Sequence, residues 1–286
     1  MCRIIADRQR SALFMGSFGP NISLRKGRPM NTSRQSPFRC LVTGASRGIG
    51  AAIVGDLASA GYPIALTART ESDLLAVAST LDVPHLVIPG DVTDPTAADR
   101  IVKNVVSEWN GLDVLVINAG EGISAPITRT DDALWERMIE LNLNAPFRFM
   151  RAAIPTMKEQ GFGRIIVIAS VASRVGAPYI SAYTAAKHGV LGLVRSAAAE
   201  LSSHGITVNA VCPGYVNTPM TARTVDSIVE KTGRERSEVL HTLAQEQGHG
   251  KLIEPEEVAA TVNFLVHEQG AINGQGITLD GGKVQI

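Results

Sequence analysis

The sequence predicts an α/β fold: a single-domain, doubly wound parallel sheet of about seven strands with helices on both faces. Two observations predict it. Short apolar runs rich in β-branched residues alternate with helical patterns from Phe38 onward. Several runs, such as Ile165-Ile166-Val167-Ile168, are continuously apolar, which is typical of strands buried on both faces of a parallel sheet. Sheets of this kind bind ligands beyond the carboxyl ends of their strands.

The elements follow one another without an internal repeat. The strands are expected at Phe38 to Thr43, Pro63 to Thr67, His85 to Pro89, Asp113 to Ile117, Arg164 to Ala169, Ile206 to Val211 and Gly276 to Leu279. Helical patterns lie between them, and the two longest run from Asp131 to Lys158 and from Ser181 to Ser203. Because no second domain is visible, residues 38–286 are assigned to one domain.

A segment from about 219 to 252 interrupts this alternation. It is polar, has a helical pattern and carries Gly233, Gly248 and Gly250. It follows the sixth strand, where ligands bind in such sheets. We therefore interpret it as a substrate lid. The alternative, a surface insertion without a role, is less favoured because of where the segment starts.

Residues 1–37 differ in composition from the rest of the chain. Arginine and lysine far outnumber acids there, since Asp7 is the one acidic residue. We interpret this stretch as a disordered arm, or as the product of an upstream start codon with Met30 as the natural start. The alternative is a mitochondrial transit peptide, which is also arginine-rich and poor in acids. The arm is left out of the fold prediction.

Composition excludes several classes of function. The chain has 286 residues, 45% hydrophobic and 19% charged, with a formal net charge of +0. It therefore lacks the basic balance that general nucleic-acid binding needs. No stretch is long and apolar enough to span a membrane, and no His, Cys and acid cluster has metal-ligand spacing. Cys2, Cys40 and Cys212 show no paired spacing, so reduced cysteines and a cytoplasmic location are expected.

A glycine-rich motif follows the first expected strand. It reads Thr43-Gly44-Ala45-Ser46-Arg47-Gly48-Ile49-Gly50 and opens an amphipathic stretch. Strand, glycine loop and helix together form the context of a dinucleotide site, because the glycines let the backbone approach a diphosphate at the helix N-terminus. No Gly-Lys-Ser/Thr follows, so the loop is not a nucleoside-triphosphate P-loop. The expected cofactor contacts are Gly44, Ser46, Arg47, Gly48, Ile49 and Gly50.

A second motif lies far downstream. Tyr183 and Lys187 are four residues apart, and Ser170 lies thirteen residues before the tyrosine. Residues four apart share one helix face, so the phenol and the amine can meet. A tyrosine ordinarily titrates near pH ~10, and a nearby cation lowers its pKa. The pair alone is a weak signal, but together with the glycine loop it predicts an acid/base site.

With these motifs the sequence resembles the short-chain dehydrogenase/reductase family, from about Phe38 to Gly282. One departure is Ile117, where the family usually has asparagine before Asn-Ala-Gly. The stretch Ile206 to Met220 is similar to 3-oxoacyl-thioester and aromatic polyketide ketoreductases within the family. The resemblance implies a Rossmann-type fold. It is carried by Thr43 to Gly50, Asp91-Val92, Asn118-Ala119-Gly120, Asn142, Ser170, Tyr183, Lys187 and Pro213-Gly214.

The resemblance implies a role for each catalytic candidate. Tyr183 gives its proton to the developing alkoxide while hydride passes from the cofactor to a carbonyl carbon. Lys187 lowers the pKa of Tyr183 and holds the nicotinamide ribose. Ser170 bonds the substrate oxygen, and Asn142 holds a water that returns protons from solvent. Tyr179 and Tyr215 are candidates for lining the substrate pocket.

The resemblance also extends the cofactor site. Asp91 and Val92 are implied to contact the adenine. The small turn formed by Asn118, Ala119 and Gly120 lets the backbone approach the nicotinamide side. Pro213-Gly214 turns the chain towards the nicotinamide carboxamide, and Thr218 can bond the carboxamide or a phosphate. The remaining expected cofactor contacts are Tyr183, Lys187 and Val216.

The end of the second strand indicates which dinucleotide is bound. It reads Leu66-Thr67-Ala68-Arg69, with Ala68 where an acidic residue would select NAD by bonding the ribose 2′-hydroxyl. Arg69 follows, and Arg47 lies within the glycine loop. Two guanidinium groups suit a 2′-phosphate, so NADP (NADPH) is favoured and NAD is the lesser alternative.

The substrate is predicted only by class, as a carbonyl compound. The sequences Lys158-Glu159-Gln160-Gly161 and Ser202-Ser203-His204-Gly205 offer a thin basic patch for an acidic acyl-carrier protein. A CoA thioester or a free cyclic ketone is therefore as plausible. The rivals are an NAD-linked 3-hydroxyacyl-CoA or secondary alcohol dehydrogenase, a non-catalytic dinucleotide-binding regulatory protein, and a methyltransferase using S-adenosylmethionine. A homo-oligomer, a tetramer or dimer packed through the two long helices, is implied by the resemblance.

Overall fold

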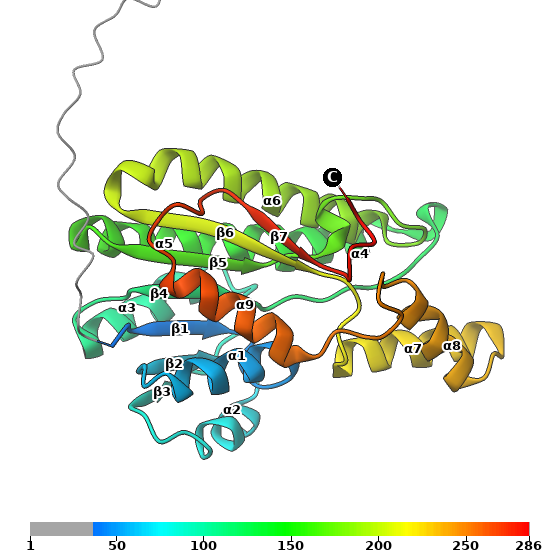
Figure 1. The fold of residues 1–286 in the computed structure, drawn as a ribbon, viewed down its shortest axis with the longest axis horizontal. Helices are drawn as coiled ribbons and strands as arrows, with labels where there is room; N and C mark the ends of the chain where they lie inside the picture. The colour runs from blue at the N-terminus through cyan, green and yellow to red at the C-terminus, as the bar shows by residue number, and fades with distance from the viewer. Residues whose placement is uncertain (1–36, 286) are drawn as a thin grey trace, which may run out of the picture. The chain divides into compact units, whose positions relative to one another are not determined.

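The computed structural model describes residues 37–285, which form a seven-stranded sheet with every strand parallel (Figure 1). The strand order is β3-β2-β1-β4-β5-β6-β7, which confirms the predicted doubly wound fold. The predicted strand positions hold to within a few residues. The strands are β1 (Cys40–Thr43), β2 (Ile64–Thr67), β3 (His85–Val87), β4 (Val114–Ile117), β5 (Gly163–Ile168), β6 (Ile206–Pro213) and β7 (Gly276–Leu279).

Helices cover both faces of the sheet. They are α1 (Gly48–Ser59), α2 (Glu71–Ala78), α3 (Ala97–Trp109), α4 (Asp132–Ile139), α5 (Ala145–Gln160), α6 (Ser181–Leu201), α7 (Pro219–Thr232), α8 (Arg236–Gln245) and α9 (Pro255–His267). One apolar cluster joins the sheet to α3, α5 and α6, and a second joins it to α1 and α9. Neighbouring strand residues alternate between the clusters: Leu115 lies in the first, and Val114 and Val116 lie in the second.

The long helix expected from Asp131 to Lys158 is present but interrupted. A wide π-helical turn, η2 (Glu140–Asn144), separates α4 from α5. Asp131 caps the start of α4 by accepting from the Leu134 amide at 2.8 Å, and Gly161 ends α5 with a left-handed backbone. The extent of the helix was therefore predicted, whereas the wide turn inside it was not.

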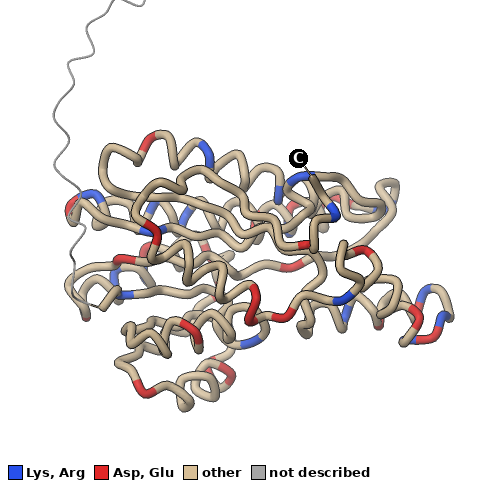
Figure 2. The backbone as a smooth tube through the Cα atoms, viewed as in Figure 1, with Lys and Arg blue, Asp and Glu red and all other residues tan. Residues whose placement is uncertain are grey.

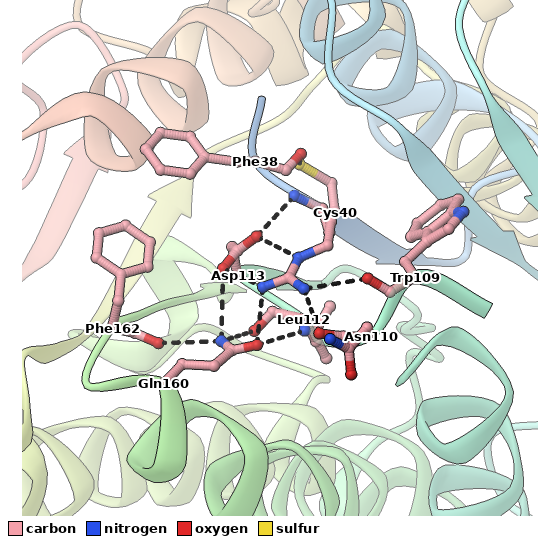
Figure 3. Close-up of polar contacts among 9 residues, drawn as sticks. Phe38, Cys40, Trp109, Asn110, Leu112, Asp113, Gln160 and Phe162 are labelled. Carbon is pink, nitrogen blue, oxygen red and sulfur yellow. Dashed lines mark hydrogen bonds and ion pairs between the residues drawn. The ribbon is translucent and has the colours of Figure 1, made fainter. Parts of the chain in front are cut away.

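A buried ion pair fixes the amino ends of β1 and β4 (Figure 3). The Arg39 guanidinium binds both carboxylate oxygens of Asp113, at 2.7 and 2.9 Å, and donates to the Trp109 carbonyl at the end of α3. Gln160, at the end of α5, accepts from Arg39 and from the Leu112 amide. The Asp113 side chain is 2% exposed. Two strands and two helices are therefore joined through one charged group, at the amino edge of the sheet.

The segment predicted as a lid forms α7 and α8, which project beyond the carboxyl end of β6 (Figure 1). The two helices share a small apolar cluster, built on Val225, Val239 and Leu243, that is separate from the two clusters of the sheet. Both ends of the segment pass side by side, because Val216 forms a parallel bridge with Ile253. We refer to residues 219–252 as the α7–α8 segment.

Four further expectations concern membrane-spanning helices, metal sites, cysteines and charge in the described residues. No helix in residues 37–285 is long and apolar enough to cross a membrane. No group of His, Cys, Asp and Glu that could hold a metal ion occurs in that part of the chain. Cys40 and Cys212 are buried free thiols, as expected. Basic and acidic residues are interspersed along the described chain (Figure 2). The arm at residues 1–37 and Cys2 lie outside the described residues, Pro37 apart.

Candidate active site

The glycine loop turns tightly between β1 and α1. Gly44 and Gly48 have φ angles of +64° and +54°, a region that residues with a Cβ rarely adopt. A Cβ at Gly50 would collide with the Gly44 carbonyl and lie 2.6 Å from Nδ2 of Asn118. Arg47, at the N-cap of α1, makes no side-chain capping bond, so the first amides of α1 stay open to an anionic ligand.

A cleft of about 530 Å³ lies at the carboxyl ends of β1, β2, β3 and β4 and at the start of α7. Most of the residues predicted to bind the cofactor line it: Gly44, Ser46, Arg47, Gly48, Ile49, Arg69, Asp91, Val92, Asn118, Ala119, Gly120 and Thr218. The residues predicted to bind the cofactor that do not line it are Gly50, Tyr183, Lys187, Pro213, Gly214 and Val216. Gly50 packs beneath the loop, and Pro213 and Val216 are buried beside the α7–α8 segment.

The side chain of Asn118 is engaged in holding the cleft together. Its Nδ2 donates to the carbonyls of Thr43 and Gly44, each at 3.0 Å. Thr43 Oγ1 in turn accepts from the amides of Asn118 and Ala119. The carboxyl ends of β1 and β4 are thereby fixed to each other, which places the glycine loop and the Asn118-Ala119-Gly120 turn on one wall.

Several lining residues were missed by the sequence analysis. Glu121 and Arg137 form an ion pair at 2.6 Å on the wall of the cleft, and Arg223 reaches it from α7. Arg137 and Leu141 are one helical turn apart, so their spacing already indicated that they share one helix face. The other missed residues are Ala68, Thr70, Asp73, Gly90, Thr93, Pro219 and Met220, though Ala68 had been placed at the ribose end of the site.

The structure brings Ser170, Tyr183 and Lys187 together. Ser170 follows β5 and accepts from the Ala172 amide at 3.1 Å, while Tyr183 and Lys187 share one face of α6. Lys187 Nζ donates to the Ile168 carbonyl at 3.0 Å and lies 5.6 Å from the centre of the Tyr183 ring. The hydroxyl of Ser170 is close enough to Tyr183 to lower the pKa of the phenol. The predicted trio therefore meets at the carboxyl end of β5.

The expected lowering of the Tyr183 pKa by Lys187 is wrong for the protein alone. Burial raises the pKa of Tyr183 to about 12, and the hydrogen bond from Ser170 opposes this rise. Burial lowers the pKa of Lys187 to about 8. Lys187 Nζ lies over the ring of Tyr183. At neutral pH Tyr183 therefore keeps its proton and can serve as a donor.

Asn142 lies in the π-helical turn and is 1% exposed. Its Nδ2 donates to the Glu121 carbonyl at 3.0 Å and to the Met138 carbonyl at 3.1 Å. A Cβ built on Gly120 would lie 3.0 Å from Asn142 Oδ1 and 3.7 Å from Lys187 Nζ. The amide and the amine therefore face the same glycine, which lines the cleft.

Two tyrosines were candidates for the substrate pocket. Tyr215 follows β6 and is close enough to Tyr183 for its charge to raise the Tyr183 pKa further. Tyr179 is 65% exposed and has a left-handed backbone with φ of +68°. The structure thus places Tyr215 beside the trio and leaves Tyr179 at the surface.

Lys187 gives a pH-dependent prediction for stability. Its pKa of about 8 in the folded chain is below the ordinary value of 10.5. Between these values the unfolded chain binds more protons at this amine than the folded chain does. The contribution of Lys187 to the free energy of unfolding therefore rises as pH rises from about 8 to about 10.

The measurement is urea denaturation of the wild type and of Lys187→Met at several pH values. We expect the free energy of unfolding of the wild type, minus that of the variant, to increase across this range. Groups present in both proteins cancel in the difference. A difference that stays constant with pH would contradict the lowered pKa.

Comparisons with known proteins agree with this geometry. The family model described as short chain dehydrogenase matches residues 39–229. The chain is 37% identical over 251 residues to D-beta-hydroxybutyrate dehydrogenase of Rhizobium meliloti (strain 1021), covering 85% of this chain and 96% of the relative. It is 35% identical over 247 residues to 3-oxoacyl-[acyl-carrier-protein] reductase FabG of Escherichia coli (strain K12), covering 86% and 97%.

A solved structure is similar as well. A variant of actinorhodin polyketide ketoreductase, crystallised with NADPH, superposes with a TM-score of 0.83 at 33% identity. The match covers 86% of this chain and 97% of that one. The resemblance predicted from the motifs is therefore confirmed over the same part of the chain.

Proposed function

This chain belongs to the short-chain dehydrogenase/reductase family and is an oxidoreductase with an NAD(P) cofactor, and on that premise we propose that it reduces a ketone to a secondary alcohol with NADPH. One observation carries the proposal. The Gly120–Gly122 stretch connects the cofactor cleft to the acid/base residues: Gly120 lines the cleft and faces Lys187, and the Tyr183 ring lies 3.7 Å from a Cβ built on Gly122.

The cleft fits an NADP cofactor. The open amides at the start of α1 and the crowded glycines suit the diphosphate, and Asp91 and Val92 suit the adenosine. Arg47 and Arg69 are exposed and line the cleft, and their guanidinium groups make no hydrogen bond or ion pair with any described residue. They would hold the 2′-phosphate. When bound, the cofactor supplies the hydride.

The residues of this chain handle the proton. Tyr183, which is protonated at neutral pH, donates its hydroxyl proton to the substrate oxygen as that oxygen gains charge. Ser170 donates a second hydrogen bond to the same oxygen. Lys187 and Asn142, which face Gly120 together, would return a proton to Tyr183 from the solvent side.

The substrate is proposed to be a 3-oxoacyl thioester or a similar carbonyl compound. Two relatives are named as a 3-oxoacyl reductase and a hydroxybutyrate dehydrogenase. Both names refer to a substrate with an oxygen on its acyl chain. Tyr215, which lies beside the trio, and Met220, at the start of the α7–α8 segment, are both partly exposed and would contact such a chain. This segment would act as the substrate lid.

A second candidate function, oxidation of an alcohol with NAD, rests on a different observation. Asp73 on α2 lines the cleft close in sequence to Arg69, and an acid near the ribose favours NAD. This chain would then act as an NAD-linked 3-hydroxyacyl or secondary alcohol dehydrogenase.

A cytoplasmic homo-oligomer is also proposed, supported by the exposed Trp135 and Phe147 on the long helix formed by α4 and α5.

The test is a panel of 3-oxoacyl-CoA esters, acyl-carrier thioesters and cyclic ketones, followed by oxidation of NADPH and of NADH. We expect turnover of at least one class with NADPH. Cofactor binding is measured separately by NADPH fluorescence. A chain that binds neither dinucleotide, or binds S-adenosylmethionine instead, would show that the proposal is wrong. Binding without turnover of any carbonyl would favour the regulatory alternative.

Arg69→Asp tests the choice of cofactor. Because it replaces a phosphate-binding cation with a repelling anion, we expect the Kd for NADPH to rise by about 100-fold and the Kd for NADH to change little. Both constants are measured by fluorescence titration. Lys103→Asp, the same change in charge on an exposed face of α3 outside the cleft, is the control. Equal losses for both cofactors would mean that the 2′-phosphate lies elsewhere.

A further inference from the structure

Arg223 is a cation of the cleft that the proposed function does not use. It lies on α7, is exposed and lines the cleft. The α7–α8 segment carries two other arginines, and both are paired: Arg234 bonds Thr242 at 2.8 Å, and Arg236 bonds Asp226. The guanidinium group of Arg223 makes no hydrogen bond or ion pair with any residue of the described chain. Its charge is therefore available to a ligand.

The start of α7 lies against the glycine loop. A Cβ built on Gly48 would be 3.3 Å from Thr218 Cγ2 and 3.8 Å from Pro219 Cδ. Residues four apart share a helix face, so Arg223 stands directly after Pro219 on the side that lines the cleft. The first turns of α1 and α7 thus meet at Gly48. The guanidinium of Arg223 projects from α7.

The sheet order indicates which phosphate Arg223 can reach. Arg69 follows β2, whereas α7 follows β6, and β1 with its glycine loop lies between those two strands in the order β3-β2-β1-β4-β5-β6-β7. Arg223 and Arg69 therefore approach the glycine loop from opposite sides. The ribose phosphate belongs to the Arg69 side, which leaves the diphosphate over the start of α1 for Arg223.

The α7–α8 segment packs as a unit of its own. Its apolar cluster is separate from those of the sheet, and its ends are joined at the bridge between Val216 and Ile253. At that neck the Asn217 amide donates to the Ile253 carbonyl at 2.8 Å. The segment is also held near its other end, where the Gly248 amide donates to the Asp280 carbonyl at 2.7 Å. A bond from Arg223 to a bound phosphate would add an attachment through the cofactor.

We propose that Arg223 binds the diphosphate of the dinucleotide and so ties the α7–α8 segment over the cleft. Charge-assisted bonds from arginine to phosphate are strong and directional, which suits this attachment. The inference rests on the proposed cofactor binding. It assigns to the lid a residue for the cofactor rather than for the substrate.

The test compares Arg223→Gln with Arg236→Gln, a matched change on the same segment outside the cleft. We expect Arg223→Gln to weaken NADPH and NADH alike, by about tenfold, in fluorescence titrations. Hydrogen exchange is then measured at saturating cofactor. The cofactor should slow exchange in α7 and α8 of the wild type and of Arg236→Gln, and should not do so in Arg223→Gln.

Each other outcome has one meaning. Unchanged affinity and unchanged protection in Arg223→Gln would overturn the inference and leave the proposed function standing. A loss confined to NADPH would place Arg223 at the 2′-phosphate, which overturns the assignment to the diphosphate. A wild type that binds neither cofactor would overturn the proposed function itself, and this inference with it. Circular dichroism of each variant verifies that it is folded.

Discussion

Tyr183→Phe is expected to lower kcat by roughly a thousandfold while leaving the Kd for NADPH nearly unchanged, because a positioned proton donor typically contributes 10²–10⁴-fold. The substitution removes the hydroxyl beside Ser170 and leaves the ring next to Gly122 in place. Turnover is measured by oxidation of NADPH with the best substrate of the panel. Binding is measured by cofactor fluorescence.

The control is Tyr179→Phe, the same chemical change on a side chain that is 65% exposed. It should retain wild-type kcat. If Tyr183→Phe keeps most of its activity, the proton comes from another group. If it loses cofactor affinity in proportion to kcat, the loss is one of binding and the donor role is not supported.

Arg39→Ala is expected to lower the free energy of unfolding by about 3–5 kcal/mol, because it removes a cation that makes two hydrogen bonds to a buried carboxylate. The Asp113 side chain is 2% exposed and receives two bonds from the guanidinium. The Trp109 carbonyl loses its bond from the same group. The measurement is urea denaturation at neutral pH.

Arg236→Ala serves as the comparison, since it breaks an ion pair with Asp226 in which both side chains are about half exposed. Exposed pairs of this kind typically contribute about 0–1 kcal/mol. The Arg39 pair is important for stability only if its loss is several times larger than that of the Arg236 pair. Losses of similar size would show that solvent screens both pairs equally.

The fold and the trio could be predicted because their signals are local. A strand, a glycine loop and a helix are adjacent in sequence, and the four-residue spacing of Tyr183 and Lys187 places them on one face. Ser170 ends a strand, so its position at the carboxyl edge of the sheet follows from its place in the chain. These features depend on short stretches whose geometry is fixed by the backbone.

The features that escaped prediction depend on distant contacts. Arg39 and Asp113 are 74 positions apart, and no sequence pattern around either residue predicts that they pair. Arg223 and Arg137 look like ordinary exposed helix residues until the packing of α7 and α4 turns them to the cleft. The pKa of Tyr183 has the opposite direction to the one expected because burial, which outweighs the nearby amine, cannot be read from spacing.

The π-helical turn at Asn142 constrains how this chain can change in length. Such a turn holds an additional residue relative to regular α-helix, and each residue rotates the rest of the helix by about 100°. Deleting one residue from Glu140–Asn144 would therefore convert the turn to regular α-helix, which keeps Phe149, Met150 and Met157 on the core face but displaces the Asn142 amide. A chain with that deletion should therefore keep its fold and lose the position of the amide that faces Gly120.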